Sequence, residues 1–153
     1  LTIIFLMWIG ASPASTGGGI KTSTLAISFL NTFSIAKGKN RLELFGREIS
    51  EFSIKRAYSQ VFLSLLTVGL AITLVTIFNE ELPLKAIIFE SFSAFGTVGL
   101  SMGITPQLSD ASKIVLSVTM FIGRVNLLTL IAAVIKQVRF QQYRYPSEDI
   151  LIN

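Results

Sequence analysis

The chain has 153 residues and a net charge of +4, with 51% hydrophobic and only 14% charged side chains. Soluble domains carry about 25% charged residues, so this composition and the mean hydropathy of +0.66 indicate a membrane protein. Cysteine and histidine are absent, which excludes disulfides, thiolate or imidazole metal sites and histidine-based catalysis.

The first apolar run, residues 1–10, is about 15 Å long as a helix, half of a ~30 Å hydrocarbon core. Pro13 and three glycines at 17–19 then interrupt it, and apolar residues return at 25–35. Such an interruption is typical of membrane proteins that place irregular backbone beside a pathway, although a plain loop between unrelated segments fits equally. Because the sequence starts in an apolar run without methionine or signal-peptide features, we expect a fragment that begins inside a transmembrane segment.

Residues 37–56 are rich in lysine and arginine with interleaved glutamates. The positive-inside rule predicts that this short stretch is cytoplasmic. Its mixed signs favour a surface helix or docking face over a nucleic-acid-binding patch.

The next segment, residues 57–78, is uncharged and about 33 Å long as a helix, enough to span a membrane. Starting from a cytoplasmic stretch, it runs outward. Residues 84–94 are too short to span, at about 16 Å, which predicts a re-entrant helix whose C-terminal dipole end favours a cation. Residues 114–138 form the last span, and the basic residues at its inner end agree with the same orientation.

The stretch from Phe95 to Ser101 is rich in glycine and hydroxyl groups. Irregular backbone at membrane depth must be buried in protein or line water. We therefore interpret it as an ion filter, in which backbone carbonyls replace the water shell of an ion and glycine supplies the required backbone angles. A surface turn is the alternative. The candidate filter residues are Thr97, Val98, Gly99, Leu100 and Ser101, with the backbone of Thr97, Val98 and Gly99 as ligands of K⁺.

A short internal repeat joins the two ends of the chain. Met7-Trp8-Ile9-Gly10 recurs as Met120-Phe121-Ile122-Gly123, each late in an apolar run. Duplicated hydropathy is typical of pores and transporters; chance among apolar residues is the alternative.

Three motifs together resemble the Ktr/Trk/HKT superfamily of potassium transporters, and above all the bacterial Ktr membrane subunit. Gly10–Thr22 resembles the intramembrane loop of the third repeat, Thr97–Ser101 the filter of the fourth, and Phe121–Arg124 the second helix of the fourth. One departure is Asn126-Leu127, where a small pair such as Gly-Pro is expected, and it leaves the local bending of the helix open.

The resemblance implies an all-α membrane protein with helix, re-entrant pore loop, helix repeats around one potassium-channel-like pseudo-fourfold pore. It also implies a multi-pass plasma-membrane transporter, not an enzyme, that moves K⁺, with Na⁺ or H⁺ coupling left open and no covalent cofactor. The expected partners are the remaining repeats of the same chain, membrane lipid, a second copy in a homodimer and a cytoplasmic ring of nucleotide-binding regulatory subunits.

The predicted organisation follows from this resemblance. Residues 1–36 form the broken second helix of the third repeat, with its gating loop at about 11–21, and residues 37–56 form a cytoplasmic linker. The fourth repeat follows at 57–138, with helix 57–78, pore helix 83–95, filter 96–102 and helix 112–138. Residues 139–153 form a cytoplasmic C-terminal tail.

The glycine-rich loop is the predicted gate, because glycine permits switching between two loop shapes. Its candidate residues are Gly17, Gly18, Gly19 and Lys21. Arg124 lies near the middle of its predicted span, where an arginine costs about 2.5–3.5 kcal/mol, so it must face protein or water. A pair with Glu90 would brace the filter; contact with the carbonyls of the glycine loop is the alternative.

Two other functions compete with this prediction. The chain could be a subunit of a symmetric tetrameric two-helix potassium channel, although the half-repeat before Ala57 disfavours this. A phosphate-binding ATPase loop at Gly18–Ser23 is a distant alternative, because Ile20 occupies the place of the glycine that such a loop requires before its lysine.

Overall fold

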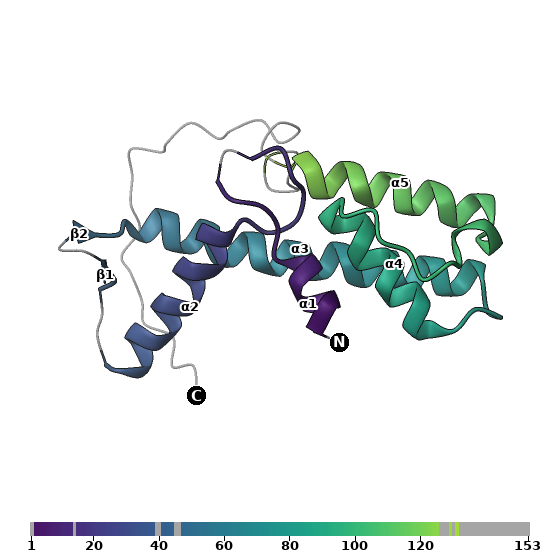
Figure 1. Ribbon diagram of the computed structural model, residues 1–153. Helices are drawn as coiled ribbons and strands as arrows, with labels where there is room; N and C mark the ends of the chain where they lie inside the picture. Colours follow the sequence, from purple (N-terminus) through teal and green to yellow (C-terminus); the bar gives the residue numbers. More distant parts are fainter. Residues whose placement is uncertain are drawn as a thin grey trace, which may run out of the picture.

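The computed structural model describes residues 2–13, 15–38, 41–44, 47–125, 129 and 131. The described chain is mostly helical (Figure 1). Its elements are α1 (Thr2–Trp8), α2 (Thr22–Ala36), β1 (Glu43–Leu44), β2 (Arg47–Glu48), α3 (Glu51–Phe78), α4 (Leu84–Gly96), the 3₁₀ turn η1 (Thr105–Gln107) and α5 (Asp110–Val125).

Helix α3 runs along the length of the molecule (Figure 1). Helix α2 packs beside it, and α4 and α5 both contact it as well as each other. Among the described helices, α3 alone is long and apolar enough to cross a membrane, judged by length and composition. Helix α5 is described as far as Val125, so the rest of the span predicted at 112–138 and the tail at 139–153 lie outside the described residues.

Helix α3 begins earlier than the hydropathy pattern predicts. Its first residue is Glu51 and not Ala57, because the side chain of Ser50 caps the helix by accepting a hydrogen bond from the Ser53 N–H at 3.4 Å. An acidic residue in the first turn also suits the positive end of the helix dipole. The linker predicted at 37–56 is therefore shorter, and it contains the two-stranded hairpin of β1 and β2, in which Glu43 pairs with Glu48.

The apolar core lies between α3, α4 and α5. Its buried members are Val75, Ala86, Ile87, Ala94, Ile104, Leu108 and Leu116. A second cluster of Ile20, Val68 and Phe95, with Trp8 packed against it, joins the start of α2 to α3 and α4. The end of α4 thus sits between both clusters.

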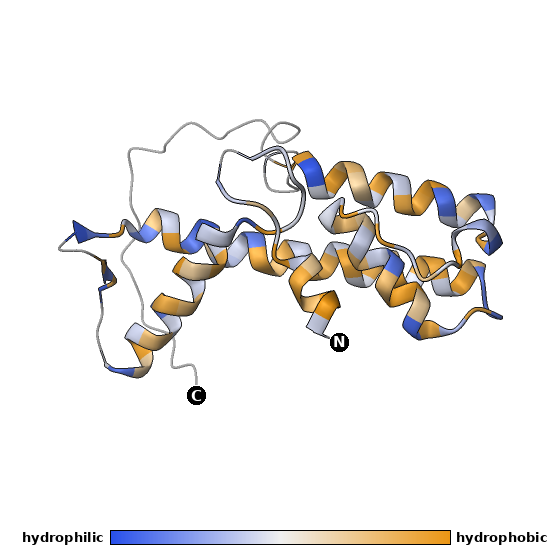
Figure 2. Cartoon of the chain, viewed as in Figure 1, coloured by the Kyte–Doolittle hydropathy of each residue, from blue (hydrophilic) through white to orange (hydrophobic). Residues whose placement is uncertain are grey.

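Many large apolar side chains point outward from the helices. Phe62 is 65% exposed, Leu70 57% and Ile114 66%, and Figure 2 shows hydrophobic residues all along α3 and α5, with hydrophilic ones gathered at the hairpin and the connecting turns. Exposed apolar surface of this extent marks faces that lipid or other protein covers.

Two glycines allow the helices to approach the end of α4 closely. A Cβ atom added to Gly123 of α5 would overlap the carbonyl oxygen of Phe95, and one added to Gly96 would overlap the carbonyl oxygen of Met7. Helices α1 and α5 therefore both meet the last turn of α4 through backbone contacts that a side chain would prevent.

Candidate functional site

The candidate filter starts where α4 ends. Thr97 caps α4 in the left-handed conformation, at φ +51° and ψ +37°, and its N–H donates to the carbonyl of Ala94. A β-branched residue at positive φ is a backbone outlier, of a kind that costs about 1–3 kcal/mol and gathers at functional sites. Gly99 follows at φ +81°. The chain thus turns sharply twice within three residues.

The carbonyl groups of the filter segment are unoccupied by protein donors. Among the described residues, no backbone or side-chain group donates a hydrogen bond to the carbonyls of Thr97 through Leu100. All four residues are exposed, whereas the last turn of α4 before them is buried. Because these four consecutive carbonyls accept no hydrogen bond from the described residues, they are available to an external ligand.

The glycine-rich loop between α1 and α2 is closed at its base. Ile9 and Ile20 form a parallel β-bridge, in which the Gly10 N–H donates to the Ile20 carbonyl at 2.7 Å and the Ile20 N–H to the Trp8 carbonyl at 3.2 Å. Gly19 has φ +85°, and its Cβ position lies 3.0 Å from the Cα of Gly10. The two halves of the interrupted segment are therefore held side by side, with the glycines between them.

The structure brings the loop into direct contact with the start of the filter. The N–H of Gly18 donates to Thr97 Oγ1 at 3.0 Å, across 79 positions of sequence. Gly18 is buried, and a Cβ atom on it would lie 2.8 Å from Thr97 Oγ1 and 3.0 Å from the Phe95 carbonyl oxygen. Gly17 and Lys21 are exposed, and Lys21 stands at the N-terminus of α2.

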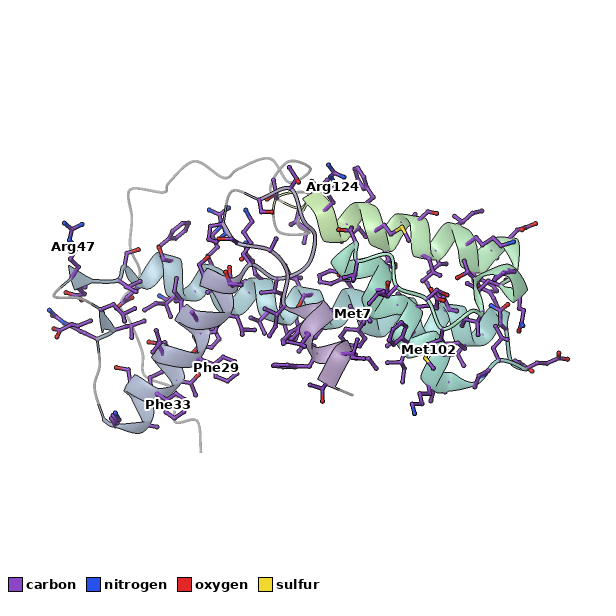
Figure 3. All side chains as sticks on the ribbon, viewed as in Figure 1. Met7, Phe29, Phe33, Arg47, Met102 and Arg124 are labelled. Carbon is purple, nitrogen blue, oxygen red and sulfur yellow. The ribbon has the colours of Figure 1, made fainter. Side chains whose placement is uncertain are left out.

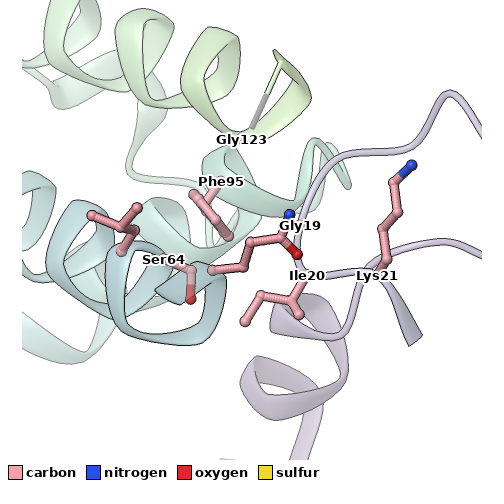
Figure 4. Close-up of a pocket in the computed structure, with 8 residues that line it drawn as sticks. Gly19, Ile20, Lys21, Ser64, Phe95 and Gly123 are labelled. Carbon is pink, nitrogen blue, oxygen red and sulfur yellow. The ribbon is translucent and has the colours of Figure 1, made fainter. Parts of the chain in front are cut away.

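A small cavity separates the loop from α3 and the end of α4 (Figure 4). Gly19, Ile20 and Lys21 line it from the loop, Gln60, Leu63 and Ser64 from α3, and Phe95 and Gly123 from α4 and α5. The cavity therefore lies where the glycine loop, α3, the end of α4 and α5 meet.

Polar side chains of α3 anchor the two halves of the broken segment, and the sequence analysis did not identify them. Trp8 Nε1 donates to Ser64 Oγ at 3.2 Å, and Thr24 Oγ1 donates to Gln60 Oε1 at 3.0 Å. Gln60 and Ser64 share one face of α3 because they are four residues apart. A glutamine and a serine at this spacing in an uncharged span were the signal available in the sequence.

The predicted pair of Glu90 and Arg124 is not formed in the described part of the chain. The carboxylate of Glu90 instead accepts hydrogen bonds from the hydroxyls of Ser101 and Thr105, the latter at 3.0 Å. Arg124 is exposed and lies in the last described turn of α5 (Figure 3). The neighbouring Gly123 touches Phe95, about 7 Å further along α4 than Glu90. Glu90, in the middle of α4, thus bonds to the end of the filter and to the segment after it, whereas Arg124 follows a residue that touches the C-terminal end of α4.

The loop does not have the framework of a phosphate-binding ATPase. That motif requires a strand before the loop, whereas the element before Gly17 is the helix α1. Lys21 makes no side-chain hydrogen bond or ion pair within the described residues. The structure therefore gives the ATPase alternative no support.

Comparisons with known proteins agree on one family. The sequence model of TrkH, described as a cation transport protein, matches residues 1–143. Potassium/sodium uptake protein NtpJ of Enterococcus hirae is 39% identical over 97% of this chain and 34% of its own length. Ktr system potassium uptake protein D of Bacillus subtilis is 39% identical over 98% of this chain and 33% of the relative's own length. Ktr system potassium uptake protein B of the same organism is 41% identical over 97% of this chain and 34% of the relative's own length. The chain thus spans about a third of the length of these curated relatives.

The family match covers the glycine loop, α4 and the filter segment, and it extends across nearly the whole chain. It confirms the resemblance that the motifs predict. Proteins of this family are membrane transporters and not enzymes. The chain belongs to the TrkH family of cation transport proteins.

Proposed function

We propose that this chain forms part of a potassium-selective pore, in which the carbonyls of Thr97, Val98, Gly99 and Leu100 replace the hydration shell of K⁺. The observation that carries the proposal is a run of four exposed residues, directly after the buried end of α4, whose carbonyls accept no hydrogen bond from the described part of the chain. The partial negative charge at the C-terminus of α4 favours a cation at this place, and rings of carbonyls are the established means of K⁺ selection. The names of three relatives, which describe potassium or potassium/sodium uptake, support the same ion.

The rest of the pore comes from outside this segment. Four carbonyls on one strand provide one side of an ion site, so further repeats of the same polypeptide complete the ring around K⁺. The pore works in a plasma membrane as a homodimer on a cytoplasmic ring of nucleotide-binding subunits, with the C-terminus inside. Two relatives named as parts of a Ktr system support an assembly of several subunits, and Na⁺ is the candidate coupling ion because one relative is named for potassium/sodium uptake.

The glycine loop acts as the gate of this pore. Its contact with the filter supports this role, because Gly18 donates to Thr97 and any outward movement of the loop must break that bond. Gly19 and Gly123 line one small cavity, which supports the alternative in which Arg124, next to Gly123, contacts the carbonyls of the loop. We expect that deleting residues 15–18 raises basal K⁺ flux; unaltered flux would contradict the gate.

Growth rescue tests the proposed function. The protein of full family length that carries this segment is expressed in cells that lack potassium uptake, and growth is followed at low K⁺ over several Na⁺ concentrations. We expect growth at K⁺ levels where the empty cells fail. Absence of rescue with the protein present in the membrane would reject potassium uptake as the function.

A further inference from the structure

We propose that Glu90 is the positioning residue of the filter: one oxygen of its carboxylate holds the hydroxyls of Ser101 and Thr105 and thereby fixes the backbone that leaves the filter. The inference rests on the proposed function, because it assigns a role in the same ion site. It replaces the ion pair with Arg124 that the sequence suggests, and it adds Thr105 to the residues on which the filter depends.

The hydrogen bonds around Glu90 form a compact group. Ser101 Oγ and Thr105 Oγ1 both donate to Oε1 of Glu90, the second at 3.0 Å, and the two hydroxyl oxygens lie 2.9 Å apart. The N–H of Gly103 donates to Ser101 Oγ at 2.9 Å. Since each hydroxyl has a single hydrogen, the carboxylate uses both of them. The Glu90 carboxylate therefore links Ser101 and Thr105 directly to α4, and Gly103 indirectly through Ser101.

The burial of Glu90 makes this arrangement costly to disturb. Glu90 is 7% exposed, and a buried carboxylate requires hydrogen-bond partners. Among the described residues, no buried polar side-chain atom lacks a partner, and the hydrogen bonds that Glu90 accepts from this part of the chain go to Oε1. Glu90 lines a cavity of about 320 Å³ together with Gly99, Ser101 and Lys113. The carboxylate thus faces the same space as the filter.

Few backbone hydrogen bonds hold the chain from Gly99 to Gly103, and Ile104 after it is buried in the apolar core. Val98 donates its N–H back to Ser93 of α4 at 3.0 Å. Between Gly99 and Gly103, the described residues make no backbone-to-backbone hydrogen bond, and the next one joins Gln107 to Ile104. The positions of the Gly99 and Leu100 carbonyls are therefore set from one side by the end of α4 and from the other by the bonds to Glu90 together with the burial of Ile104.

Four variants in the protein of full family length separate positioning from charge. Glu90→Leu removes the acceptor. Glu90→Gln keeps an oxygen that can accept both hydroxyls but removes the negative charge. Thr105→Val removes one donor without changing shape. Thr73→Val is the matched control, because the Thr73 hydroxyl donates only within its own helix, to the Gly69 carbonyl.

K⁺ uptake is measured at matched amounts of protein in the membrane. Two quantities are compared between variants: the K⁺ concentration that gives half-maximal uptake and the Na⁺ concentration that halves uptake. We expect Glu90→Leu to lose about tenfold in discrimination between K⁺ and Na⁺ and Thr105→Val about threefold, as the loss of charged and ordinary hydrogen bonds suggests. Glu90→Gln and Thr73→Val should stay near the wild type.

Two results would overturn the inference. The first is that Thr105→Val discriminates between K⁺ and Na⁺ as well as Thr73→Val does. The second is that Glu90→Gln loses as much discrimination as Glu90→Leu, which would assign the effect to the negative charge. If Glu90→Leu does not reach the membrane, Thr105→Val decides alone. Failure of the unmodified protein to take up K⁺ would instead reject the proposed function, so the two failures are distinguishable.

Discussion

Replacement of Gly123 by alanine tests the close packing at the end of α4. A Cβ atom at this position would lie 2.9 Å from the carbonyl carbon of Phe95 and nearer still to its oxygen. These are backbone atoms, so no side chain can turn away to make room. Overpacking costs typically about 1–3 kcal/mol, and a backbone neighbour favours the upper end. The gain in helix propensity from glycine to alanine is about 1 kcal/mol, which leaves a net loss of about 2 kcal/mol.

Gly69 of α3 provides the matched control. It is also a helical glycine, but a Cβ atom there would meet no heavy atom within 4 Å. Gly69→Ala should therefore gain up to about 1 kcal/mol from helix propensity alone. The two substitutions are chemically identical and should shift stability in opposite directions.

The assay is thermal unfolding of the purified protein of full family length in one detergent, with Na⁺ competition for K⁺ uptake measured in parallel. We expect Gly123→Ala to unfold at a lower temperature than the wild type and Gly69→Ala at the same or a higher one. Because Phe95 stands two residues before Thr97, the shift should also weaken selection of K⁺. Equal unfolding temperatures for both variants would refute the proposed backbone contact.

Two further substitutions test how α3 holds the other elements. Asn79→Leu should lose about 2–3 kcal/mol of stability, because the Asn79 side chain bonds to the Ser112 hydroxyl and accepts the Ser109 N–H at 2.9 Å; an unfolding temperature equal to that of the wild type would contradict this. Trp8→Phe should cost about 1 kcal/mol by removing the bond to Ser64 at 3.2 Å, and faster proteolysis between α1 and α2 would report it. Unchanged cleavage there would show that the bond does not hold the loop.

The sequence was informative where composition alone decides the structure. The low content of charged residues and the long apolar run of α3 predict a helical membrane protein, and the family match agrees. The start of α3 was misplaced because hydropathy marks where apolar residues begin, whereas the helix begins at its cap, Ser50. A capping serine followed by an acidic residue in the first turn was present in the sequence, so this boundary was predictable in principle.

The partner of Glu90 was not predictable in the same way. Sequence reasoning paired the two charges nearest to the filter, but the choice of partner depends on how the chain after Gly99 folds back on α4. Positive φ values at Thr97, Gly99 and Gly103 turn that segment so that hydroxyls reach Glu90 first. The close approach of Gly123 to Phe95 also depends on three-dimensional packing, which a single glycine in an apolar run does not reveal.

Selectivity of a Gly99 variant tests the central claim most directly. Gly99 has φ +81°, and no heavy atom of the described residues lies within 4 Å of its Cβ position, so serine there meets no atom of this segment but strains the backbone by about 1–2 kcal/mol. Gly38 is the matched control, at φ +73° with equally open space but in the linker. The measurement is inhibition of K⁺ uptake by Na⁺ in the protein of full family length. We expect Gly99→Ser to reduce K⁺ preference about tenfold, as a change of about 1–2 kcal/mol at the ion site would, while Gly38→Ser leaves it unchanged. Equal K⁺ preference in both variants would contradict a filter at Thr97 to Ser101.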